Sequence, residues 1–258
     1  MKPDIDAFLF GLSQVAKRGP IPAVGSGPNS VGKTLQYALG ISHSKFNKNN
    51  YCGFTFTATK RALGGRARSN LFSRAPNWGY SEIKSRKEFF ETVSSNSNVH
   101  EGKLYCTVDA LKPNAYGLIL DILEDKYSFQ AFRTGESTKI ITELLTFPDH
   151  SVRSLVSWPL SDILHLLQAK ANNFALVQAH QLNDNEQSLF QFRNVEICSN
   201  LVIDEFSTIL LDGGITLDHL LSINANGSVL EKGPMFKIRN DCRARLYTDW
   251  MLVDLLDL

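Results

Sequence analysis

The stretch from Gly25 to Arg61 constrains the fold more than any other, because it combines a glycine-rich loop, an apolar helix and an alternating strand. Within it, Gly27–Thr34 fits G-x4-G-K-[ST], the pattern of a loop that holds nucleotide phosphates through backbone N–H groups and a lysine. Such a loop follows a buried strand, yet the preceding Gly19–Val24 contains two prolines, which cannot donate hydrogen bonds to a neighbouring strand. The pattern therefore admits a second interpretation.

The segment after this loop has the features of a helix. Ser30 suits the N-cap position, and Gly40 suits the C-terminal end. Between them, apolar residues recur at spacings of three and four: Val31, Leu35, Ala38 and Leu39. We therefore expect a helix that packs one face inward.

A strand is predicted at Tyr51–Thr57, where apolar and polar side chains alternate. This alternation places Phe54 and Phe56 on one face of the strand. Thr55 and Thr57 then lie on the opposite face. Because the phenylalanines are expected to pack into the core, the threonine face is where a site would lie.

Further segments predict a mixed α/β architecture. Apolar spacing indicates a helix over Asp4–Lys17 and another that is capped at Ser199 and ends at Gly213. Leu118–Leu123 and Tyr127–Phe132 have the length of strands and are expected to pair as a hairpin.

The order of helix, polar loop and strand is typical of one nuclease group, in which G-x-G-x-T-[LF]-E opens the helix and D-x4-E-x-K lies on the strand. Ser30–Ile41 fits this helix, with Ser30 in place of the first glycine. Two more segments are similar, Asn70–Pro76 and Gly233–Ile238, the latter close to a pattern ending in F-R-I. On these motifs the chain resembles the MvaI/BcnI restriction endonucleases, MutH-like members of the PD-(D/E)XK superfamily.

The resemblance implies an α/β fold, in which a mixed sheet is flanked by helices and two lobes form a DNA cleft. It covers most of the chain, so residues 1–258 are expected to form a single restriction-endonuclease-like domain. Within it, residues 1–150 would form the nuclease-like core and residues 151–258 a recognition and packing lobe.

The resemblance also identifies the positions of the catalytic residues. In the resembled enzymes the acids bind Mg²⁺, which polarises the phosphate and activates water, while a lysine orients that water. Carried over position by position, these groups are replaced here by uncharged residues: Gln36, Asn50, Thr55 and Thr57. We therefore expect no ordinary metal-dependent cleavage, no catalytic residue and no cofactor, with Mg²⁺ required only if cleavage is retained.

Two clusters of basic residues are candidate DNA contacts. The first follows the predicted strand and consists of Lys60, Arg61, Arg66 and Arg68. The second lies near the C-terminus and consists of Lys232, Lys237 and Arg239. In the resembled enzymes, this region of the chain contributes to the recognition of DNA bases. Since the formal net charge is only +1, affinity for DNA must come from such local clusters.

The remaining composition bears on compartment and partners. Four scattered cysteines without a C-x2-C pair, and the lack of a signal segment or a long apolar run, indicate a cytoplasmic protein that does not enter a membrane. The expected partner is double-stranded DNA, together with a protein partner in a defence or restriction system.

Three functions remain open. The leading hypothesis is a DNA-binding protein that keeps the nuclease fold without its catalytic charges. The second is an enzyme, either an endonuclease with a metal site relocated to Asp109 and Asp121, or a phosphate-loop NTPase that uses Lys33, Thr34 and Asp204. The third is a scaffold for protein interactions.

Overall fold

The structure, a computed structural model, describes residues 3–27, 29–41, 50–60, 63, 65–96, 102–125, 138–184, 187–231 and 233–258. Contacts between Cα atoms divide the chain into two compact units, each assembled from separate segments. Unit 1 consists of Met1–Ala67, Lys170–Val202 and Arg243–Leu258, and unit 2 of Arg68–Ala169 and Ile203–Cys242. The units are thus interleaved along the chain instead of meeting near residue 150, because their sheets pair strands that are distant in sequence.

The helices follow the expected apolar periodicity where it is strongest. The described helices are α1 (Ile5–Lys17), α2 (Ser30–Ala38), α3 (Arg86–Asn96), α5 (Leu160–Ala171), α6 (Glu205–Leu211) and the 3-10 helix η1 (Asn240–Leu246). The first begins as predicted, since Asp4 caps it by accepting a hydrogen bond from the N–H of Ala7. Among the described helices, none has both the length and the apolar character needed to cross a lipid bilayer.

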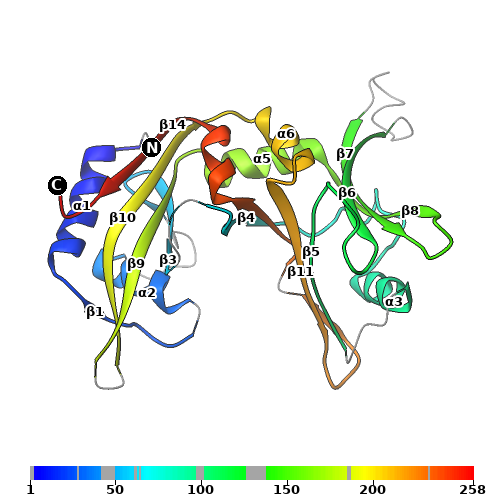
Figure 1. Ribbon diagram of the computed structural model, residues 1–258, viewed down its shortest axis with the longest axis horizontal. Helices are drawn as coiled ribbons and strands as arrows, with labels where there is room; N and C mark the ends of the chain where they lie inside the picture. Colours follow the sequence, from blue (N-terminus) through cyan, green and yellow to red (C-terminus); the bar gives the residue numbers. More distant parts are fainter. Residues whose placement is uncertain are drawn as a thin grey trace. The chain divides into compact units, whose positions relative to one another are not determined.

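Unit 1 is built on sheet A, which has the strand order β1-β10-β9-β3-β2, with β14 also paired to β10. Its strands are β1 (Ile21–Pro22), β2 (Asn50–Tyr51), β3 (Phe54–Thr59), β9 (Phe174–Asp184), β10 (Gln187–Leu201) and β14 (Tyr247–Asp254). β3 and β9 are parallel and the other pairs are antiparallel, so the predicted mixed sheet is confirmed. Figure 1 shows β9 and β10 as long neighbouring strands, with α1 beside β10.

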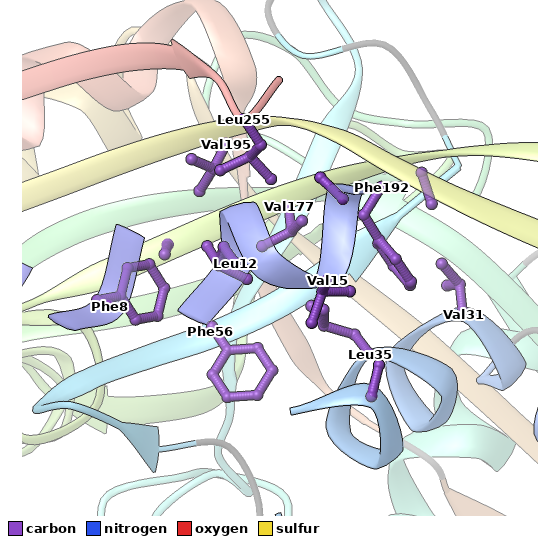
Figure 2. Packing of buried hydrophobic residues seen from close by; sticks show 14 of the residues in the cluster. Phe8, Leu12, Val15, Val31, Leu35, Phe56, Val177, Phe192, Val195 and Leu255 are labelled. Carbon is purple, nitrogen blue, oxygen red and sulfur yellow. The ribbon is translucent and has the colours of Figure 1, made fainter. Parts of the chain in front are cut away.

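The core of unit 1 lies between sheet A and the helices α1 and α2. Phe8 and Leu12 of α1 are fully buried, and Phe54 and Phe56 of β3 are almost so, which confirms the predicted apolar face of this strand. Full burial of one such side chain contributes about 1.5–3 kcal/mol to folding. Figure 2 shows Phe8, Leu12 and Phe56 packed with other members of this cluster, including Val15, Val31, Leu35, Val177, Phe192, Val195 and Leu255.

Two details of the segment from Gly25 to Arg61 differ from expectation. The predicted strand Tyr51–Thr57 is a hairpin instead, in which β2 and β3 are joined by Cys52 and Gly53. Both turn residues have positive φ, 48° and 84°, as a two-residue hairpin turn of type I′ requires. The helix α2 takes Asn29 as its N-cap residue, so that Ser30 is its first helical residue.

Unit 2 contains two antiparallel sheets. Sheet B has the order β12-β11-β13-β4, with β5 paired to β11, and sheet C has the order β6-β7-β8. The strands of sheet B are β4 (Arg68–Ser73), β5 (Lys103–Val108), β11 (Ile215–Ile223), β12 (Val229–Glu231) and β13 (Met235–Arg239). Those of sheet C are β6 (Leu118–Asp125), β7 (Thr138–Thr146) and β8 (Val152–Pro159).

Two predicted elements take a different form. β6 pairs with β7, and the strand predicted at Tyr127–Phe132 lies outside the described residues. The helix predicted from Ser199 begins only at Glu205, because Ser199 and Leu201 belong to β10 and pair with β14. Strand pairing satisfies the backbone groups of these residues, so helical spacing of the apolar side chains does not decide their structure.

Candidate nucleic-acid interface

The strand positions identified as catalytic by resemblance lie together on one face of sheet A. Asn50 of β2 lies directly opposite Thr55 of β3, and residues opposite each other in an antiparallel pair have Cα atoms about 4.5–5.5 Å apart. Thr57 follows on the same face, with partly exposed side chains at both threonines. The structure therefore places these three positions on one face of the β2–β3 pair.

The fourth position, Gln36, lies on α2 and is partly exposed. Its neighbour Leu35 points into the core of unit 1, and the helix contacts β3. The helix and the hairpin that carry the four positions thus belong to one packed unit. Gln36 has an amide where the resembled enzymes have a carboxylate.

The same face of sheet A contains a buried carboxylate, Glu196 of β10. The register places Glu196 opposite Leu176, which itself lies opposite Thr57. Its two oxygens are occupied: one accepts the indole N–H of Trp250 at 2.9 Å, and the other is paired with the buried guanidinium of Arg243. Glu196 is therefore held in an internal charge pair, which the sequence alone did not reveal.

Two of the predicted basic residues of unit 2, Arg68 and Lys237, belong to a charge network on one face of sheet B. Asp218 of β11 is at its centre, with its carboxylate oxygens 2.6 Å from Arg68 Nη1 and 2.6 Å from Lys237 Nζ. Arg68 also donates to the hydroxyl oxygens of Thr107 at 3.0 Å and Thr216 at 2.8 Å. Because register partners share a face, β4, β5, β11 and β13 all contribute to this network.

The network keeps Asp218 ionised. Burial by itself would raise the pKa of this carboxyl, since its side chain is only 10% exposed. Hydrogen bonds from Lys237 and Thr107 oppose that effect, and the charge of Arg68 adds to them. The result is a pKa below the ordinary value for aspartate, so the cluster holds one anion between two cations.

The other predicted contacts are placed as follows. Arg239 makes a bidentate ion pair with Asp241, with N–O distances of 3.0 and 2.6 Å. In unit 1, Lys60 donates to the amide oxygen of Gln181 at 3.0 Å, and Arg66 is exposed. Arg61 and Lys232 lie outside the described residues. The structure thus groups Arg68 with Lys237, a pairing across the sheet that basic composition did not specify.

The segment that fits the phosphate-loop pattern has a different structural setting. The strand before it, β1, has two residues and pairs antiparallel with β10 at the edge of sheet A. Thr34 is buried, and its hydroxyl accepts from the N–H of Val24 at 2.8 Å and donates to the carbonyl of Ser30 at 2.8 Å. This hydroxyl ties α2 to the preceding loop, while Lys33 is exposed.

Two of the acids proposed for other enzyme chemistries, Asp109 and Asp204, lie in local turn and helix-cap positions. Asp109 accepts hydrogen bonds from the backbone N–H groups of Leu111 and Lys112 at 2.9 and 3.4 Å, and Asp204 is the N-cap residue of α6. Across the part of the chain that the structure describes, no group of three or more His, Cys, Asp or Glu side chains is placed to hold a metal ion.

Comparison with solved structures identifies the fold. A structure described as the restriction endonuclease MvaI–cognate DNA substrate complex matches with a TM-score of 0.71, at 13% sequence identity over 99% of each chain. A structure of MvaI in the absence of DNA matches with a TM-score of 0.50, at 13% identity over 98% of each chain. The α/β fold is therefore that of a restriction endonuclease.

Comparison at the level of sequence identifies the family. Residues 10–247 match the MvaI/BcnI restriction endonuclease family, whereas no individual curated protein matches the chain. Because this match covers nearly the whole sequence, the chain belongs to the MvaI/BcnI restriction endonuclease family.

Proposed function

We propose that this protein binds double-stranded DNA without cleaving it by the metal-dependent route of its family. It would act in the cytoplasm as a targeting or partner subunit of a defence or restriction system, together with a second protein. DNA binding would require no cofactor. This role uses the nuclease fold as a binding scaffold.

The observation that carries the proposal is the strand pair β2–β3. Asn50 and Thr55 face each other across it and Thr57 follows on the same face, so the strand positions of the family's two acids and lysine are all uncharged. Amide and hydroxyl oxygens can complete the coordination of Mg²⁺, but carboxylates supply the charge that offsets its costly dehydration. Without them, neither an electrophile nor a positioned water is available for hydrolysis.

DNA binding is supported by the face of sheet B that carries the charge network. Arg68 and Lys237 remain 30% and 20% exposed while Asp218 holds them in position. Positioned cations of this kind can donate to phosphates or to guanine in the major groove. Tyr105 lies on the same face and is exposed, which adds an aromatic surface to the charged one.

One gel experiment tests both halves of the proposal. Purified protein is incubated with duplex DNA in the presence of Mg²⁺ or Mn²⁺, and binding and cleavage are scored together. We expect retarded DNA and no cleavage products. Cleavage by the natural chain would favour a relocated metal site, and the lack of any retardation would favour a scaffold for protein interactions.

A second experiment restores the family's charges in one chain, as Gln36→Glu, Asn50→Asp, Thr55→Glu and Thr57→Lys. We expect Mg²⁺-dependent cleavage to appear, because the metal regains its ligands and the water its lysine. Thr57→Lys alone is the control, since it adds positive charge without adding a metal ligand. If the natural protein already cleaves and alanine at these positions leaves cleavage intact, this assignment of the site is wrong.

A further inference from the structure

Unit 2 contains a pocket of about 480 Å³ that belongs neither to the charge network nor to the catalytic positions. It is formed by the loop that follows β4 and by the junction of β8 with α5. The lining residues on which its chemistry depends are Arg74, Pro76, Trp78, Trp158, Pro159 and Asp162. This volume is sufficient for a nucleobase with part of its sugar.

The pocket is lined by two tryptophans and two prolines together with polar residues. Trp158 lines the pocket from a buried position, 1% exposed, and its indole N–H donates to the carbonyl of Arg74 at 3.0 Å, so it has no free polar hydrogen. Pro76 is buried, and Trp78 is half-buried. Aromatic and proline surfaces of this kind suit a planar ring, because bases stack on indoles.

The rim of the pocket has one cation and one anion. Arg74 Nη2 and Asp162 Oδ2 are 3.6 Å apart, and their side chains are 51% and 41% exposed. This separation exceeds hydrogen-bonding length, and exposed pairs of this type are weak. Both groups can therefore turn to a ligand at little cost to folding.

The pocket is held in shape by its neighbours. The N–H of Asn77 donates to the carbonyl of Ser157 at 2.9 Å, and the N–H of Ser157 donates to the hydroxyl of Ser81 at 2.9 Å. The side-chain oxygen of Asn77 accepts from the N–H of Gly79 at 3.0 Å. These bonds fix the loop against β8, so a ligand would meet a preformed site.

We propose that this pocket binds a guanine base. A carboxylate at the position of Asp162 can accept from N1–H and N2–H of guanine together, while the guanidinium of Arg74 donates to O6 on the same edge. Adenine presents an acceptor at N1 beside a donor at N6, which leaves the carboxylate without a second donor. The base would stack on the indole of Trp78.

The guanine can come from a free nucleotide or from a base that leaves the stack of a bound DNA strand. The second source rests on the proposed function, whereas the first does not. Unstacking costs least where a base is already unpaired, so unpaired guanine in DNA is the appropriate probe.

Binding of free nucleotides is tested by calorimetry with GMP and AMP on the full chain. Two of the three tryptophans line the pocket, so quenching of intrinsic fluorescence gives an independent reading. We expect GMP to bind at least tenfold more tightly than AMP, and Asp162→Asn to abolish the difference. The matched control is Glu82→Gln, because Glu82 forms a similar exposed pair with Arg153 at 3.8 Å outside the pocket.

The DNA source is tested by fluorescence anisotropy with labelled duplexes. One has guanine opposite an abasic site, the second has adenine there, and the third is fully paired. A preference for unpaired guanine that Asp162→Asn removes supports the proposal even if free GMP does not bind. If neither GMP nor unpaired guanine is preferred, or if Asp162→Asn and Glu82→Gln behave alike, the proposal is overturned. If the natural chain binds none of the duplexes but still prefers GMP to AMP, the proposed function is contradicted and the guanine site is not.

Discussion

At the scale of single residues, the most unusual side chain is His219 of β11. It is 2% exposed and lies between two buried glutamates, with its Nε2 2.9 Å from Glu143 and its Nδ1 3.5 Å from Glu231. Arg86 pairs with Glu231 from the other side at 2.9 Å. Burial alone would lower the pKa of His219, but the charges and hydrogen bonds of the glutamates, Glu143 first, raise it to about 9.

This pKa predicts a loss of stability in alkaline solution. Because the folded pKa of His219 lies above its ordinary value of 6.5, its contribution to the free energy of unfolding is complete below pH 6.5 and is lost as the pH rises through about 9. The linked contribution is on the order of 3 kcal/mol. Urea unfolding of the natural chain between pH 6 and pH 10 measures it.

The comparison chain for this measurement is His219→Gln, which should be less stable at pH 6 and should lack most of the decline above pH 7. His165→Gln is the control, since His165 is exposed on α5. A natural chain whose stability stays constant from pH 6 to pH 10 would show that His219 does not carry a stabilising proton.

At the scale of elements, the turn between β2 and β3 depends on left-handed backbone. Gly53 has φ of 84°, which a residue with a Cβ adopts at a cost of about 1–2 kcal/mol, so Gly53→Ala should destabilise the protein by about this amount. Gly32 lies in α2 with no atom near the place of an added Cβ, so Gly32→Ala should stabilise by up to about 1 kcal/mol. Equal effects in thermal unfolding would contradict this assignment of the turn.

Strand β13 of sheet B gives a prediction about the salt dependence of DNA binding. Replacing Lys237 and Arg239 of β13 by alanine should weaken DNA binding and reduce the slope of log affinity against log salt by up to about 2, because each phosphate contact releases about 0.9 counterion. Filter binding or anisotropy between low and physiological salt measures both quantities.

The control for this pair removes the same charge elsewhere in unit 2, as Lys87→Ala with Arg153→Ala. Both side chains are exposed and lie outside sheet B. If the two double variants have the same affinity and slope, charge in general and not this face of the sheet determines binding.

At the scale of the whole molecule, topology decides between two interpretations of one local motif. Gly27–Thr34 fits the phosphate-loop pattern, yet it follows a two-residue antiparallel edge strand in a restriction endonuclease fold. We therefore expect no tight binding of ATP in the presence of Mg²⁺, measured by calorimetry. Tight binding that Lys33→Ala abolishes would instead support a nucleotide site in this loop.

The sequence by itself determined those features that depend on neighbours along the chain. Helical spacing predicted α1, and strict alternation predicted that Phe54 and Phe56 are buried while Thr55 and Thr57 lie on the opposite face. Short-range motifs were also sufficient to identify the family. The Cys52–Gly53 turn was missed, because a cysteine with positive φ has no sequence signal comparable to Asn-Gly.

Only the tertiary structure decided which distant groups meet. Asp218 lies between Arg68 and Lys237 because the register of three strands brings them onto one face, and no local pattern specifies that register. In the same way, strand pairing with β14, not helical spacing, determined the structure at Ser199. The spacing of apolar residues along the chain predicts which side chains face inward. The partners of a buried charge instead depend on contacts between segments far apart in the chain.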